Sequence, residues 1–167
     1  MTERDRLIDQ LEREIGGEPW HGPSLTSILE GISPEHAARR PSPDAHSIWE
    51  ILLHMTGWKR EVARRAQGHA AADPAAGDWP AIGEMSESRW RAAREDHFRA
   101  QRELVELARG LTEAQLDAKV KGDTAAYIGA GITVRATLYG VLQHDVYHAG
   151  QIAILKKIAG GSIRYGL

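Results

Sequence analysis

The sequence contains no cysteine among its 167 residues. This absence excludes disulfide bonds, thiolate metal ligands and a cysteine nucleophile, so any thiol chemistry needs a thiol from outside the protein. A chain without disulfides is compatible with a reducing compartment. The N-terminal residues Met-Thr-Glu-Arg-Asp-Arg are not followed by the apolar stretch of a signal peptide. We therefore expect a cytoplasmic protein.

The sequence also lacks an excess of charge of either sign and any long hydrophobic run. The 21 Lys and Arg residues nearly balance the 23 Asp and Glu residues, which gives a formal net charge of −2. This balance does not favour binding to nucleic acid or to an acidic membrane surface. No apolar run approaches the roughly 18 residues that suggest a membrane span. We expect a small-molecule substrate, and neither nucleic acid nor a membrane as a partner.

The rest of the composition is that of an ordinary globular protein, with 42% hydrophobic and 26% charged residues. A chain of this length matches one domain with one sizeable core, so we predict a single domain over residues 1–167.

Hydrophobic residues recur at helical spacing along the chain, and no segment has the clean alternation of a strand. Gly16-Gly17 interrupts the first helix, while Ser47 and Thr133 have the positions of N-caps. The predicted helices cover approximately residues 2–16 with 25–32, 47–68, 86–109 and 133–159. The predicted fold class is all-α: an up-down-type four-helix bundle with a broken first helix and long connecting loops at 68–84 and 121–132.

Three histidines lie in the apolar stripes of two of these helices. His144 and His148 are four residues apart, so they share one face of the fourth helix. His54 falls between Ile51 and Trp58 on the second helix. Each is either an ordinary core or surface histidine or a metal ligand. A buried histidine must satisfy both ring nitrogens, and one ion would do so for all three side chains.

Three protein ligands with one open position are the pattern of catalytic zinc sites. Neutral imidazole also suits nickel, copper or ferrous iron, so the ligand set does not select the metal. Glu50 lies one helical turn before His54, where it can act as a general base or orient a metal-bound water. Alternatively, Glu50 forms a capping box with Ser47.

Four further residues are candidates for the lining of a pocket at this site. Asp145 can hold an imidazole tautomer or pair with a neighbouring helix. Trp20 and His21 lie in a loop and can shape the pocket mouth, although Trp20 can equally be a packing residue. His97 faces inward on the third helix, as a pocket or core residue. A role as fourth ligand stays open for His21 and His97.

Segments from three parts of the chain resemble the DinB/YfiT-like family. They are Trp20-His21-Gly22-Pro23-Ser24-Leu25, His46-Ser47-Ile48-Trp49-Glu50 with His54 and Trp58, and Gln143-His144-Asp145-Val146-Tyr147-His148-Ala149-Gly150-Gln151-Ile152. The resemblance implies a bacterial four-helix bundle that forms a homodimer and binds a divalent metal through His54, His144 and His148. Zinc or nickel is the expected ion, and iron, manganese and copper stay open.

The same resemblance implies a reaction class. Bacterial thiol-dependent S-transferases and a mycothiol-dependent isomerase are similar in fold and metal site. We therefore expect a metalloenzyme of the thiol S-transferase type, with an external low-molecular-weight thiol such as bacillithiol, mycothiol or glutathione as co-substrate. Two alternatives remain, a hydrolase that uses a metal-bound water and a non-enzymatic, metal-stabilised ligand-binding bundle.

Overall fold

The structure, a computed structural model, describes residues 1–160 of the chain. Over these residues it is all-helical, and the only β-type pairing found there is an isolated bridge between Lys119 and Thr133. The helices are α1 (Glu3–Gly16), α2 (Leu25–Leu29), α3 (Pro34–Ala38), α4 (Ile48–Ala66), α5 (Glu87–Gly110), α6 (Glu113–Asp117) and α7 (Val134–Ile158). The predicted all-α fold class is confirmed.

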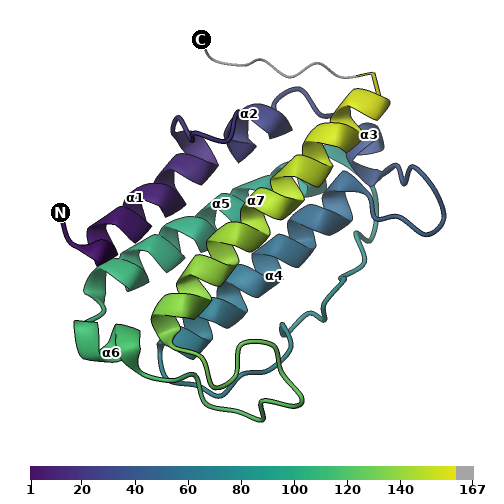
Figure 1. Cartoon of the computed structure of the whole chain (residues 1–167). Coiled ribbons are helices and arrows are strands. Elements are labelled where there is room, and N and C mark those ends of the chain that lie inside the picture. The colour runs from purple at the N-terminus through teal and green to yellow at the C-terminus, as the bar shows by residue number, and fades with distance from the viewer. Residues whose placement is uncertain (161–167) are drawn as a thin grey trace.

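The four long helices α1, α4, α5 and α7 pack side by side as a bundle (Figure 1). Helix α4 contacts both α5 and α7, and α1 contacts the same two helices. The short helix α2 continues the direction of α1 after the loop at 17–24, so the predicted broken first helix is confirmed. The bounds predicted for the other long helices differ from the observed ones by at most two residues.

The helix starts follow from the side chains that precede them. Ser47 accepts a hydrogen bond at 3.2 Å from the backbone N–H of Glu50, and a Glu50 carboxylate oxygen accepts one at 2.8 Å from the N–H of Ser47. This reciprocal pair is the predicted capping box of α4. The hydroxyl of Thr133 caps α7 by accepting from the N–H of Ala136. Both helices that carry the three histidines therefore have fixed first turns.

The core consists of two hydrophobic clusters with polar side chains between them. One cluster contains Val62 of α4 and Val141 of α7. The other contains Met55 of α4 and Ala149 of α7. The buried residues at the intervening level, which we call the polar layer, are Glu14, Thr56, Lys59, His97, Gln101 and Asp145. The three candidate ligands lie at this same level of α4 and α7.

In the part of the chain that the structure describes, no helix combines the length and the apolar character needed to cross a membrane.

Removing the cap of α4 tests the account of this helix start. We expect Ser47→Ala to lower the free energy of unfolding by about 1 kcal/mol, because the N–H of Glu50 loses its side-chain acceptor. Urea denaturation measures the change, and Ser42→Ala in the exposed loop before α4 is the control. Equal stability of the two variants would contradict this role of Ser47.

Candidate metal centre

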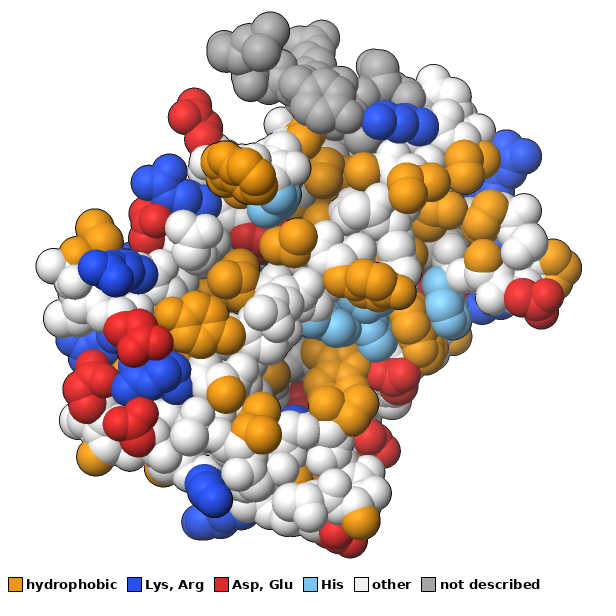
Figure 2. All heavy atoms as spheres, viewed as in Figure 1, with side chains coloured by type: hydrophobic (Ala, Val, Ile, Leu, Met, Phe, Trp, Pro, Cys, Tyr) orange, Lys and Arg blue, Asp and Glu red, His pale blue; other side chains and the backbone are white. Residues whose placement is uncertain are grey.

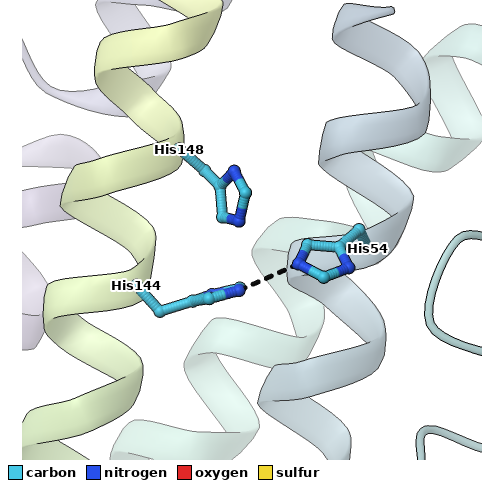
Figure 3. Close-up of side chains that lie close together, drawn as sticks. All are labelled: His54, His144 and His148. Carbon is cyan, nitrogen blue, oxygen red and sulfur yellow. Dashed lines mark hydrogen bonds between the residues drawn. The ribbon is translucent and has the colours of Figure 1, made fainter. Parts of the chain in front are cut away.

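The three predicted ligands come together between two helices. His54 projects from α4 toward His144 and His148 on α7 (Figure 3). The Nε2 atoms of His54 and His144 are 2.9 Å apart, and one potential ligand atom from each of the three residues lies within 4.8 Å of the others. Residues separated by up to 94 positions thus present their imidazoles to one point, which is the arrangement required to bind a single ion.

Hydrogen bonds at the far side of two rings orient them for metal binding. The Nδ1–H of His54 donates to the backbone carbonyl of Asp78 at 2.7 Å. Because a carbonyl only accepts, this contact leaves a lone pair on Nε2 in the neutral ring. The Nδ1 of His148 is likewise 2.7 Å from the side-chain oxygen of Gln151. Partners of this kind fix the tautomer of metal-binding histidines, so the donor set fits a divalent ion.

The protonation state of two of the rings is also the one that metal binding requires. Burial, followed by the nearby His148, His54 and Lys59, lowers the pKa of His144 to about 3. Burial is also the largest cause that lowers the pKa of His148, although the hydrogen bond with Gln151 opposes it. Neutral imidazole is the form that binds metal. His144 and His148 are therefore ready to bind an ion at neutral pH without first losing a proton.

A loop between α4 and α5 completes this side of the centre. The indole of Trp79 stacks on His54 at 3.9 Å between ring centroids and on His46 at 3.5 Å. Asp78 also accepts at Oδ1 from the indole N–H of Trp58 at 2.7 Å. Sequence reasoning missed Asp78 and Trp79, because they lie in a segment read only as an Ala-, Gly- and Pro-rich loop. The sequence feature that could have indicated them is an acidic residue next to an aromatic one in a segment of mostly small residues.

Two pockets border the histidines. One, of about 370 Å³, lies between α4 and α7, and we call it the α4–α7 pocket. Its lining includes His54, Trp58, Val62, Ile128, Ile132 and Val141. The other, of about 480 Å³, we call the His46 pocket, and its lining includes Asp44, His46, Trp79 and Gln151. Tyr147 and His148 line both pockets, so the centre can be reached from two sides.

The structure does not support the prediction of Glu50 as a general base. Its carboxylate accepts from Arg40 Nε at 2.9 Å and from the backbone N–H of Ser47 at 2.8 Å, and a second guanidinium nitrogen of Arg40 also donates to it. Partial burial alone would raise the pKa of Glu50, but the bonds from Arg40 and Ser47 outweigh it and lower the pKa to about 2. A carboxylate held in this way is a weak base, and the alternative capping-box role is confirmed.

Asp145 is not a pocket-lining residue but part of the polar layer. It is fully buried and forms an ion pair with Lys59 of α4, which is also fully buried. The inter-helix pair considered for Asp145 is therefore what the structure shows. The partner, Lys59, was missed, although its position four residues after Met55 and three before Val62 places it on the apolar stripe of α4. Burial lowers the pKa of Lys59 to about 8 despite the attraction of Glu14, so the ammonium persists at neutral pH.

The remaining candidates are not among the residues that line the two pockets at the histidines. Trp20 is fully exposed and lines a separate hollow beside Gly16 and Arg94, and His21 is exposed in the same loop. Neither residue lines the two pockets at the histidines. His97 is fully buried in the polar layer, where its Nδ1 is 2.9 Å from the hydroxyl of Thr56. The structure therefore does not place these three residues in the lining of the two pockets.

The burial of His97 makes stability depend on pH. Burial, with the charge of Lys59, lowers its pKa well below 6.5, so the native ring stays neutral while the unfolded ring is protonated at lower pH. The unfolded state then binds the extra proton, and stability falls as pH falls below 6.5. Between pH 7.5 and pH 5, we expect the free energy of unfolding of His97→Gln to fall by about 2 kcal/mol less than that of the parent. Urea denaturation with chelator present measures this difference.

The exposed His36 provides the control for this measurement, because His36→Gln removes a histidine that lies outside the buried polar layer. The parent and His36→Gln should then share one pH dependence. If His97→Gln also followed that dependence, the neutral state of His97 in the folded protein would be contradicted.

Comparison with known proteins supports the resemblance seen in the sequence. The family model described as DinB superfamily matches residues 20–152, a range that contains all three histidines and the loop with Asp78 and Trp79. A search of functionally curated proteins found no match to this chain. The family match covers more than half of the chain, and the fold and the histidine cluster agree with it. The chain therefore belongs to the DinB superfamily.

Proposed function

We propose that this protein is a metal-dependent enzyme of the thiol S-transferase type. The observation that carries the proposal is the convergence of His54, His144 and His148 at a point bordered by two pockets. A site with three protein ligands leaves a position for a reactant, whereas a purely structural site is closed by four. Two pockets provide separate places for two co-substrates.

In this proposal the three histidines hold one divalent ion, with zinc or nickel favoured by the imidazole donors. When bound, the ion supplies the charge that deprotonates a coordinating thiol. The Asp78 carbonyl and the Gln151 side chain keep the rings of His54 and His148 oriented. Trp79, stacked on His54, shields one face of that ring from water.

The reaction balances without an oxidant or a reductant. The sulfur electron pair forms a bond to an electrophilic carbon, and the leaving group, for example a halide, departs with the electrons of the broken bond. The thiol proton passes to solvent. The products are a thioether and the acid of the leaving group.

The state of Glu50 favours a thiol over water as the nucleophile. Hydrolysis at such a centre generally uses a protein base near the attacking water, and the predicted base is committed to Arg40 and Ser47. A thiol that coordinates a metal needs no such base. The hydrolase alternative is supported by one observation, because the half-exposed carboxylate of Asp78 lines the α4–α7 pocket and offers a different base.

Metal content tests the ligand assignment. We expect about one ion per chain in tag-free parent protein and a sharp loss in His148→Ala, because two ligands remain. His69→Ala, which removes an exposed loop histidine, should bind as much metal as the parent. Plasma mass spectrometry measures and identifies the ion. If the parent held little metal and took up neither added zinc nor added nickel, the three residues would be core histidines.

Consumption of a generic electrophile tests the reaction. With chloro-dinitrobenzene or a monohalobimane, we expect bacillithiol, mycothiol or glutathione to give a metal-dependent rate that is lost with chelator and in His148→Ala. Product absorbance or fluorescence measures the rate. Acceleration by none of the thiols would contradict the proposal.

Two controls separate the alternatives. Ester hydrolysis without a thiol, lost in Asp78→Asn while the metal stays bound, would establish the hydrolase instead. No reactivity, together with a large fall in melting temperature on chelation, would establish the non-enzymatic metal-stabilised bundle.

A further inference from the structure

The α4–α7 pocket has one chemically distinct end. Its walls are side chains of α4 and α7, and the segment with Ile128 and Ile132 borders it. His54, His144 and His148 form the polar end. Figure 2 shows histidine side chains reaching the surface on the face formed by these helices, with hydrophobic side chains on both sides of them. A ligand in this pocket would contact apolar side chains along its body and the imidazoles at its tip.

Among the described residues, Arg65 is the one Lys or Arg side chain in the lining, and it is not available to a ligand. Its Nε donates to Glu61 at 2.8 Å, and its two terminal nitrogens donate to the carbonyls of Ile128 at 2.6 Å and Ala72 at 2.8 Å. The side chain is buried, and Glu61 balances its charge. Arg65 therefore fastens the loop at Ile128 to α4 and does not serve as an anion-binding group.

Two other polar side chains beside the apolar walls, Thr137 and Asp78, are also engaged. Thr137 donates its hydroxyl to the carbonyl of Thr133 at 3.1 Å. The Asp78 carboxylate accepts from Trp58 at 2.7 Å, and its negative charge would repel an anionic ligand. A charged or strongly polar ligand body would lose its hydration here and gain few hydrogen bonds in return, which is costly. An apolar body would lose only unfavourable contact with water.

We propose that the α4–α7 pocket binds the uncharged, apolar body of the electrophilic substrate, an aryl or branched alkyl group, with the reactive carbon toward the three histidines. This inference rests on the proposed function. The His46 pocket, whose lining combines Asp44, His46 and Gln151 with apolar side chains, is left for the thiol. The two substrates meet beside His148, which both pockets share.

Gly140 of α7 provides a direct test. It lines the pocket, and a side chain added there would begin in open space, with no atom within 4 Å of its Cβ. Gly140→Leu should therefore fill the pocket without disturbing the bundle. Gly150 lies on the same helix, also has open space at its Cβ, and is not among the residues of either pocket. Gly150→Leu is the matched control, and both changes improve helix propensity equally.

The probe is N-phenyl-1-naphthylamine, an uncharged aromatic compound whose fluorescence rises in apolar surroundings. We expect the parent and Gly150→Leu to bind it equally, and Gly140→Leu to bind it more weakly by about tenfold or more. In a competition titration, neutral naphthalene should displace the probe at about one-tenth of the concentration needed for 1-naphthoate, or less. Equal binding by the two leucine variants, no binding by the parent, or equal displacement by naphthalene and 1-naphthoate would overturn the proposal.

These titrations use neither metal nor thiol, so their failure is separate from failure of the S-transferase reaction. Probe binding that is lost only in Gly140→Leu supports the apolar pocket even if no thiol is transferred. If transfer occurs, the KM for chloro-dinitrobenzene should rise about tenfold or more in Gly140→Leu and stay unchanged in Gly150→Leu. A KM unaffected by Gly140→Leu would place the electrophile elsewhere and overturn the proposal.

Discussion

The buried ion pair between Lys59 and Asp145 is the interaction on which the centre depends. It joins α4 to α7, the two helices that carry the three histidines. Breaking a buried pair by removing one partner generally costs about 3–5 kcal/mol, because the remaining charge is left without compensation. The pair therefore fixes how far α7 can slide along α4. Since Asp145 follows His144 directly, this constraint also sets the height of His144 relative to His54.

The polar layer extends the same constraint to the other helices. Glu14 of α1 lies near enough to Lys59 to affect its pKa, and burial raises the pKa of Glu14 itself. On α5, Gln101 donates to the carbonyl of Leu11 at 2.7 Å, which ties this helix to α1. Polar contacts of this kind are directional, and a displacement that broke them would leave buried polar groups without partners. The bundle therefore has one preferred register at the level where the candidate centre lies.

The centre is built from two kinds of structure with different tasks. Rigid helices place the ligands, and connecting loops supply their surroundings. The loop before α5 brings the Asp78 carbonyl and the Trp79 ring to His54, and the loop before α7 brings Ile128 to Arg65. Loops on a rigid scaffold commonly carry the parts of a site that differ between relatives. In this protein these loops supply part of the lining of both pockets beside the imidazoles.

The sequence by itself determined the helices, because hydrophobic spacing, the Ser47 and Thr133 caps and the glycine stops are local signals. It also identified His54, His144 and His148, since a histidine within an apolar stripe must point toward the core. The tertiary structure decided the partners of these and other polar groups. In the folded protein Glu50 contacts Arg40, Asp145 contacts Lys59, and the backbone carbonyl of Asp78 contacts His54. Such pairings join residues of different elements, and periodicity along one helix carries no information about which side chain faces it from another element.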